Sequence, residues 1–431
     1  MNAPRNSEGV RPSLSEGGVG EGAIPGLPRE AREGRTPSES LEEPRAWWVV
    51  GGAFLCVAVI FGVAYSFASF FRSFGSEFAA QRADVSLVFG LSGLIYFLLG
   101  AGAGMLADRF GPRLVCSAGM AVIAAGLLAS SFAQSMAAIY VAWGAGLGIG
   151  IGLVYAPSIA SVPPWFVRRR AFAAGIASAG IGVGTLAVPL LATAAIDALG
   201  WRHALQAIGA AVLVVGVGST LLLRRAPTRA AAGSAPPGMT LQEALRSRRF
   251  WWMYAACVLA APAMFIPFAH VSAAARDLGI GDARAVGLVG LIGVGSIVGR
   301  FAIGGLADRL GRIASIALLE ASLGACYLLW LGAGGYVALA VFALWLGLSY
   351  GGIVSLMPAL CMDLFGARAV SSILGTLYSG AAFGNLLGPV LAGAVFDRSG
   401  SYVPVIWTCL VLSMLAAAAS AQLLRDRRPI Y

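Results

Sequence analysis

Twelve long apolar stretches dominate this chain of 431 residues, and mostly short polar connections separate them. A helix needs about 20 mainly apolar residues to cross a bilayer, so these stretches predict twelve membrane spans. Only 12% of the residues are charged and 58% are hydrophobic, whereas soluble proteins carry about 25% charged residues. This deficit excludes a soluble enzyme, a nucleic-acid binder and a disordered hub. The expected spans are 46–72, 85–107, 114–132, 135–160, 171–196, 203–223, 250–275, 285–307, 313–333, 335–360, 369–395 and 402–424.

Polar segments divide the chain into two halves. Residues 1–45 are rich in Pro, Gly, Ser, Glu and Arg and contain no apolar run, which predicts a disordered tail rather than a secretory signal. The longest internal connection, 224–249, combines arginines with a Ser-Ala-Pro-Pro-Gly stretch. We therefore expect a linker at 224–249 between six-helix lobes at 46–223 and 250–424, with a short tail at 425–431.

Charge sets the expected orientation in the membrane. Connections on the side of the linker carry 17 Arg and 5 acidic residues, whereas connections on the opposite side carry 6 of each. The positive-inside rule then places the linker, and with it both termini, in the cytoplasm. The formal net charge of +10 is explained in this way without a nucleic-acid partner. The chain contains no Lys, so every basic residue is Arg.

The two halves of the sequence repeat each other. Residues 104–111 read GMLADRFG and residues 304–311 read GGLADRLG, an offset of 200 residues without a gap. The same offset recurs at Gly175/Gly375, Gly180/Gly380, Gly184/Gly384, Leu186/Leu386, Pro189/Pro389, Asp197/Asp397 and Gly200/Gly400. Parallel repeats of this kind build transporters whose binding site lies near the membrane midplane, between the two halves.

The repeated motif resembles the signature loop of the major facilitator superfamily. Further segments resemble the monocarboxylate transporters and the related oxalate/formate antiporters: Tyr155-Ala156-Pro157, Trp165-Phe166-Val167-Arg168-Arg169-Arg170-Ala171, Gly200-Trp201-Arg202, Met362-Asp363-Leu364-Phe365-Gly366, Leu387-Gly388-Pro389 and Asp397-Arg398-Ser399-Gly400-Ser401-Tyr402. This resemblance implies an all-α membrane protein of twelve helices in two pseudo-symmetric lobes, which acts as a monomeric transporter in the cytoplasmic (inner) membrane. The motif itself predicts a conformational latch in which aspartates cap helix ends or pair with arginines. Its residues are Asp108, Arg109, Arg113, Asp308, Arg309 and Arg312.

Arg300 is the main candidate for substrate binding. It lies eight residues inside the cytoplasmic end of its span, about 12 Å deep at 1.5 Å per residue. A charge at such depth is expensive, and the repeat mate of Arg300 is Gly100, so the fold itself does not require the charge. A buried guanidinium is suited to hold a carboxylate with two hydrogen bonds. The alternative is a structural contact with Asp308 or a carbonyl, but the resemblance implies a carboxylate anchor in this part of the span.

The chain departs from the family pattern around Arg300. Many animal members carry an Asp, thought to exchange protons, where this chain has Ser296, and their span 1 lysine is absent, with Tyr65 near its place. The oxalate-type antiporters add a lysine near Gly380, which this chain cannot supply. One buried positive charge fits one carboxylate, which favours a monocarboxylate over oxalate and leaves the proton-carrying residue unassigned.

Other polar residues inside the spans are weaker candidates for the substrate site. His270 can titrate near neutral pH and serves either in substrate or proton handling or as an interfacial histidine bound to a carbonyl. Tyrosine hydroxyls can orient a carboxylate, and a buried amide needs partners; the residues concerned are Tyr350, Tyr378, Tyr140, Tyr65 and Asn385. Glu320 is a second charge inside a span, and we expect it to form a structural pair near the cytoplasmic face.

Together these features predict a secondary transporter of lactate- or pyruvate-type monocarboxylates, coupled to protons or to exchange with another carboxylate. Efflux of amphipathic compounds is a second transport hypothesis. A membrane enzyme is disfavoured, because the two histidines and the scattered cysteines form neither a metal-ligand spacing nor a nucleophile–base pair. We therefore expect no cofactor and no metal. A transporter-like sensor that uses residues 1–45 to bind a partner is a third alternative.

Overall fold

The computed structural model describes residues 44–166, 170–225, 238–366 and 368–425. The expected disordered tail (1–45), the centre of the linker and the last residues of the C-terminal tail lie largely outside these residues. Twelve described helical segments are long and apolar enough to cross a membrane, which confirms the twelve predicted spans. Apart from a single isolated bridge between Gly238 and Gly366, the regular structure described is helical.

The first six spans are made of eleven helical elements. They are α1 (Pro44–Tyr65) continued by α2 (Phe67–Glu77); α3 (Arg82–Phe110); α4 (Pro112–Ser131); α5 (Met136–Ile139), η2 (Tyr140–Ala145) and α6 (Gly146–Ala160); α7 (Arg170–Leu199); and α8 (Trp201–Ala211), η4 (Val212–Gly216) and α9 (Val217–Thr220). The first span extends to Glu77 rather than ending at 72, because the amphipathic helix α2 follows the break at Ser66. A short helix, η3 (Pro163–Trp165), follows the fourth span.

The second six spans are single helices: α11 (Arg248–Asp277), α12 (Asp282–Leu310), α13 (Arg312–Leu331), α14 (Tyr336–Phe365), α15 (Val370–Ser399) and α16 (Val403–Arg425). The bounds of α3, α4 and α7 return 200 residues later as those of α12, α13 and α15. The repeat seen in the sequence is therefore a repeat of structure.

The signature motif is mostly helical rather than a loop. Helices α3 and α12 run through GMLADRF and GGLADRL, and each ends at a glycine with positive φ, Gly111 at 94° and Gly311 at 85°. Glycine reaches this conformation without steric cost. The next helix starts at the following residue in each half, so the predicted connection shrinks to one glycine.

Part of the expected linker lies within the described residues and is helical. Within it, α10 (Leu241–Arg246) begins with a capping box: Glu243 N donates to Thr240 Oγ1 at 3.3 Å, and Thr240 N donates to Glu243 Oε2 at 2.7 Å. These hydrogen bonds lower the pKa of the Glu243 carboxyl. Met239 N donates to the Phe365 carbonyl at 2.7 Å. Residues 238–249 therefore pack onto the second half of the chain instead of crossing as an unstructured connection.

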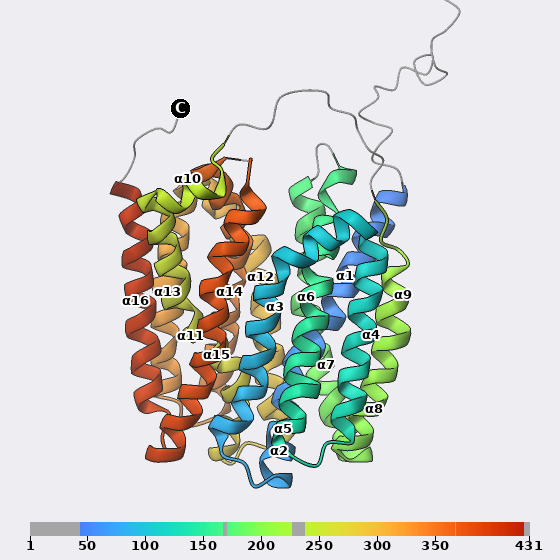
Figure 1. Cartoon of the computed structure of the whole chain (residues 1–431). Coiled ribbons are helices and arrows are strands. Elements are labelled where there is room, and N and C mark those ends of the chain that lie inside the picture. Colours follow the sequence, from blue (N-terminus) through green and yellow to red (C-terminus); the bar gives the residue numbers. More distant parts are fainter. Residues whose placement is uncertain (1–43, 167–169, 226–237, 367, 426–431) are drawn as a thin grey trace, which may run out of the picture. The chain divides into compact units, whose positions relative to one another are not determined.

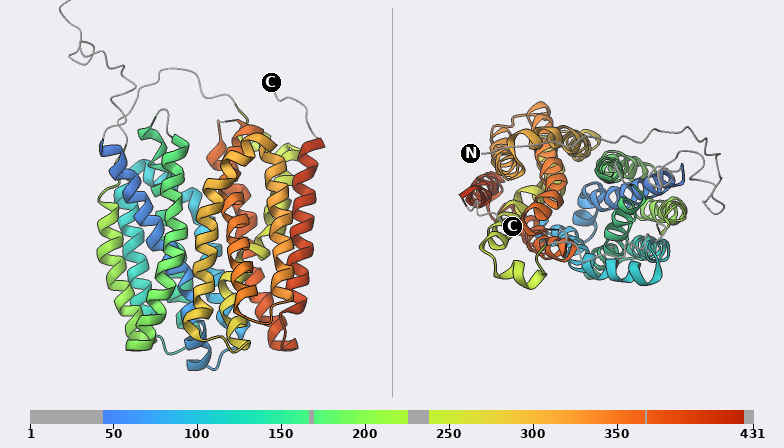
Figure 2. Two further views of the ribbon diagram at one scale, coloured as in Figure 1. Left: turned by 180° about the vertical axis from the view of Figure 1, so that it is seen from behind. Right: turned by 90° about the horizontal axis from the view of Figure 1, so that it is seen from above.

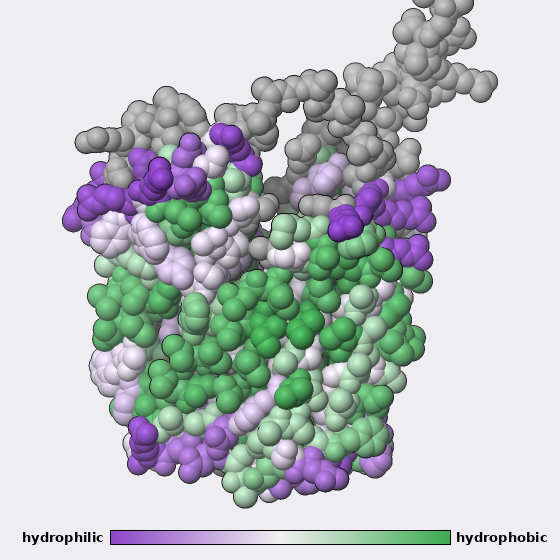
Figure 3. Space-filling model, viewed as in Figure 1, coloured by the Kyte–Doolittle hydropathy of each residue, from purple (hydrophilic) through white to green (hydrophobic). Residues whose placement is uncertain are grey.

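The helices run between two polar ends. The start of α1, the end of α16 and α10 lie at one end, which we call the linker end, and α2 lies at the other, the distal end (Figure 1). Two further views show the second-half helices grouped beside those of the first half (Figure 2). Hydrophobic residues cover the middle of the visible face and hydrophilic residues gather at both ends (Figure 3), as expected for a protein that crosses a bilayer.

Candidate functional site

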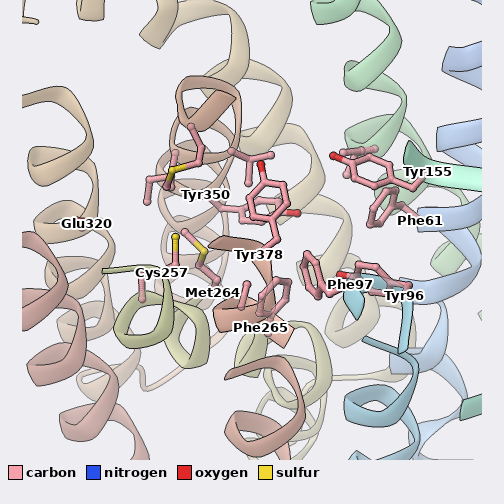
Figure 4. A pocket seen from close by; sticks show the side chains of 16 residues that line it. Phe61, Tyr96, Phe97, Tyr155, Cys257, Met264, Phe265, Glu320, Tyr350 and Tyr378 are labelled. Atoms are coloured by element: carbon pink, nitrogen blue, oxygen red, sulfur yellow. The ribbon is translucent and has the colours of Figure 1, made fainter. Parts of the chain in front are cut away.

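A cavity lies between the two halves of the helical body. Its aromatic walls come from both halves: one half supplies Phe61, Tyr96, Phe97 and Tyr155, and the other supplies Phe265, Tyr350 and Tyr378. The close-up view shows these two groups facing each other across the space (Figure 4). A site built from both repeats in this way is the arrangement that alternating-access transporters use.

Arg300 supplies positive charge beside this cavity. Its side chain is only 7% exposed, and its Nε and Nη2 atoms are buried without a hydrogen-bond partner among the described residues. The guanidinium charge acts on the hydroxyl groups of Tyr65, Tyr155 and Tyr378, of which the last two line the cavity. A buried charge normally has a partner, so these two free donors mark a place for an anion.

Neighbouring hydroxyl groups extend the polar part of the site. Tyr65 and Tyr350 bring their hydroxyl oxygens to 3.4 Å from each other across the two halves, and the Tyr65 ring stacks on Phe268 at 4.0 Å. One turn before Arg300, the Ser296 hydroxyl is buried and has no partner among the described residues. The structure thus brings Arg300, Ser296, Tyr65, Tyr350 and Tyr378 to one region.

Glu320 is placed differently from the sequence expectation. It lines the same cavity and is 1% exposed, and its Oε2 atom has no hydrogen-bond partner in the described part of the chain. No described Arg or His side chain forms an ion pair with it. The polar group beside Glu320 is the hydroxyl of Ser420 on α16, so its structural partner is a hydroxyl rather than a cation.

Contacts between the halves close the distal end. Arg82, the first residue of α3, donates to Asp277 at 2.6 and 2.8 Å and to the Tyr402 hydroxyl at 2.7 Å. Asp397 accepts hydrogen bonds from the backbone N–H groups of Arg82 and Ala83 at 3.1 and 3.0 Å, where a carboxylate also complements the helix dipole. We call Arg82, Asp277, Asp397 and Tyr402 the distal gate.

His270 belongs to this closed region rather than to the cavity wall. It is fully buried: Nδ1 lies 2.9 Å from the Tyr402 hydroxyl, and Nε2 lies 2.8 Å from the Pro389 carbonyl and 3.0 Å from the Ser86 hydroxyl. Ser86 belongs to α3 and the other two partners to the second half, so the imidazole bridges the halves. The sequence left open a carbonyl-bound histidine, and the structure supplies that carbonyl.

Comparisons with known proteins agree with this architecture. The family model of the Major Facilitator Superfamily matches residues 53–376. Monocarboxylate transporter 13 of Bos taurus is 31% identical over 360 residues, which cover 83% of this chain and 84% of that protein. Monocarboxylate transporter 12-B of Danio rerio is 28% identical over 420 residues, covering 88% and 86%.

The chain belongs to the monocarboxylate transporter family of the Major Facilitator Superfamily. It is accordingly a multi-pass membrane transporter and not an enzyme. The fold also resembles a bacterial homolog of the human lysosomal transporter Spinster, solved in an inward-facing and unoccupied conformation, with a TM-score of 0.69 at 16% identity over 90% of this chain and 100% of that one.

Tyr140 and Asn385 of this transporter make local contacts away from the cavity lining. Tyr140 donates to the Asp84 carbonyl at 3.0 Å at the exposed start of α3, because it comes only four residues after its span begins at Met136. Asn385 is buried between α15 and α3, where its Nδ2 donates to the Gly90 carbonyl at 3.4 Å and packs against Gly93. In this structure both side chains bind backbone carbonyls, and a substrate contact by either stays a prediction.

The latch arginines of the transporter make local contacts. Arg312 binds Asp363 of α14 with two hydrogen bonds of 2.6 Å. Arg109 lies over the ring of Phe110 at 5.2 Å, and Arg113 and Arg309 are exposed. The side chains of Asp108 and Asp308 lie outside the described residues. The latch thus stays a prediction at the linker end.

Sequence reasoning missed most of the aromatic cavity wall. Phe61, Tyr96, Phe97 and Phe265 carried no signal beyond ordinary core residues, whereas Tyr155 stood in the family segment Tyr155-Ala156-Pro157 and could have been found there. Among the described residues, no three His, Cys, Asp or Glu side chains come together as metal ligands.

Proposed function

We propose that this transporter moves small organic monocarboxylates of the lactate or pyruvate type together with protons by alternating access. The observation that carries the proposal is the buried Arg300 guanidinium with two free N–H donors beside a cavity between the halves. One unpaired positive charge calls for one negative charge, and the names of the curated relatives, monocarboxylate transporters, point to the same substrate class.

In the proposed mechanism, the substrate carboxylate accepts hydrogen bonds from Nε and Nη2 of Arg300. Planar guanidinium and carboxylate groups match in such a pair, which also fixes the orientation of the anion. The hydroxyls of Tyr65, Tyr350 and Tyr378 surround the remaining polar atoms of the substrate. Neutralising Arg300 then removes the unpaired charge that opposes closure of the cavity.

For the membrane arrangement, we propose that the linker end faces the cytoplasm of the cell and that the protein is a monomer in the inner membrane. Support comes from the excess of Arg in connections at the linker end. The distal gate joins the halves at the opposite end, which is the outer end in the proposed orientation. Rocking of the halves would break the gate and expose Arg300 to that side.

A second function, efflux of amphipathic compounds, is favoured by one observation. Much of the cavity wall is apolar, with Phe61, Phe97, Met264, Phe265 and Met357 among its residues. Such a wall would hold a hydrocarbon body, and Arg300 would then be dispensable.

The test is uptake into proteoliposomes of labelled lactate and pyruvate, with and without an inward proton gradient. We expect uptake that the gradient stimulates and that a protonophore abolishes. Uptake that requires preloading with a carboxylate would replace symport by exchange. No uptake of either acid by folded protein, together with transport of a lipophilic dye, would overturn the proposal in favour of efflux.

A further inference from the structure

The structure contains a second buried ionisable group that the proposed mechanism does not use. Glu320 lies on α13, 1% exposed, and lines the same cavity as Tyr350 and Tyr378. Its Oε2 atom is buried and has no hydrogen-bond partner in the described part of the chain. The matching position of the first repeat is Met120, which is also buried. The fold therefore accepts an apolar side chain at this position. Helix packing alone does not explain why the second repeat has a carboxyl group there.

The groups around Glu320 leave its negative charge uncompensated. The helices packed against α13 are α16, α14, α12 and α11. They bring to this region the hydroxyl of Ser420, the hydroxyl of Tyr350 and the thiol of Cys257. None of these forms an ion pair with the carboxylate. Keeping a buried carboxylate ionised without a paired cation is costly, so this group takes up a proton readily when further negative charge enters the cavity.

Arg300 and Glu320 lie at similar depth on consecutive helices. Arg300 is ten residues before the end of α12, and Glu320 is eight residues after the start of α13, or about 15 and 12 Å from the linker end at 1.5 Å per residue. Opposite charges therefore lie on neighbouring helices without pairing, Glu320 in the cavity wall and Arg300 beside the cavity tyrosines Tyr155 and Tyr378.

We propose that Glu320 is the proton-binding site that couples the substrate to the proton, an inference that rests on the proposed monocarboxylate transport. In the empty cavity, Arg300 is positive and Glu320 negative, so the sum of charge is zero. When a monocarboxylate binds Arg300, Glu320 takes one proton from water on the open side, and the sum is zero again. A cavity with the anion alone or the proton alone carries a net charge, which opposes its passage through the closed state. One proton therefore accompanies one monoanion.

The transport test compares wild type with Glu320→Gln, which is neutral at every pH. With lactate bound, the cavity of the variant is neutral, so lactate-for-lactate exchange is kept. Without lactate, its cavity is positively charged, so the empty transporter reorients slowly across the membrane. We expect net uptake driven by a proton gradient to fall about tenfold or more, equivalent to at least 1.4 kcal/mol in the barrier, with loss of the accompanying alkalinisation outside. Glu243→Gln, which neutralises the exposed carboxylate of α10, is the matched control and should leave both activities unchanged.

An infrared measurement separates this site from the substrate proposal. The C=O band of a protonated carboxyl group should titrate in wild-type protein and be missing in Glu320→Gln, whether or not lactate is transported. Proton-stimulated uptake that survives unchanged in Glu320→Gln, or wild-type protein without such a band, overturns the assignment of Glu320. Failure of lactate and pyruvate transport in wild type, with the band present, overturns the substrate alone.

Discussion

The two repeats of this transporter share one backbone plan, yet they differ sharply in buried charge. The first repeat has Gly100 and Met120 where the second has Arg300 and Glu320, and both charged residues lie beside or within the central cavity wall. Because the first repeat reaches the same helix bounds without them, the fold does not depend on these charges. At these two positions the buried charges belong to the second repeat alone, and the first repeat supplies mainly aromatic side chains to the cavity wall.

Helix packing differs between the repeats as well. In the second repeat, Gly295 and Gly299 of α12 meet Gly347 and Gly351 of α14, and a Cβ atom at any of them would collide with the backbone of the other helix. The first repeat carries Ile95 and Leu99 at the positions of the first two. The helix that carries Arg300 is thus held backbone to backbone, which fixes the depth and direction of the guanidinium.

The largest effect on stability is expected from Gly299→Ala, which tests this difference in helix packing. Its Cβ would meet the Leu348 carbonyl, so the helices must separate next to Arg300, at a cost of about 1–3 kcal/mol for overpacking. We expect a lower melting temperature in detergent and loss of substrate binding. The matched control is Gly100→Ala, whose Cβ meets no atom within 4 Å; it should be as stable as wild type, and equal behaviour of the two variants would contradict the packing argument.

A smaller effect is expected at the distal gate. Arg82→Ala removes the bonds to Asp277 and Tyr402 and the stacking on Phe396 at 3.8 Å. Partly exposed ion pairs contribute about 1 kcal/mol each or less, so the balance should move severalfold toward a state open at the distal end. Distances between spin labels on α2 and α12 would report this shift.

The control for the gate is Arg202→Ala, because the Arg202–Glu77 pair, at 2.9 Å, lies within the first half. It removes an arginine of similar exposure without loosening the contact between the halves. Equal distance distributions in wild type, Arg82→Ala and Arg202→Ala would show that the gate does not hold the distal end closed.

The smallest effect on stability is expected from Glu320→Met, which installs the residue of the first repeat. Replacing a buried carboxyl group by an apolar side chain of similar size should leave the free energy of unfolding unchanged or raise it by about 1 kcal/mol. Thermal unfolding in detergent measures this change. A marked drop in melting temperature would mean that Glu320 has a structural role, as the sequence had led us to expect.

Most of the fold could be predicted from the sequence, because a membrane span is a local property. Apolar length located twelve helices, and the motif at 104–111 and 304–311 revealed the repeat. The sequence prediction failed where helices contain many polar residues. It placed a loop at the motif, where α3 continues to Phe110, and it missed α10 inside the linker. The spacing of Thr240 and Glu243 is a capping-box pattern, from which the start of α10 could have been predicted.

The site was only partly predictable, because it depends on which faces meet. Arg300 stood out through its depth and its repeat mate Gly100. Glu320 gave the same kind of signal through Met120, but its pairing could be judged only from its neighbours in space. Tyr140 and Tyr155 lie on the same span, which begins at Met136. Tyr140 is therefore near the end of the span, whereas Tyr155 lies deep enough to line the cavity.

The most direct test of the central claim is equilibrium binding of labelled lactate and pyruvate to purified wild-type protein and to Arg300→Gly, which installs the residue of the first repeat. Removing one partner of a buried charge pair costs about 3–5 kcal/mol, so we predict at least a hundredfold weaker binding by a variant that remains folded. Arg425→Ala, which alters an exposed arginine bonded to Gln422 on its own helix, should bind as wild type does. Unchanged affinity in folded Arg300→Gly would contradict the account.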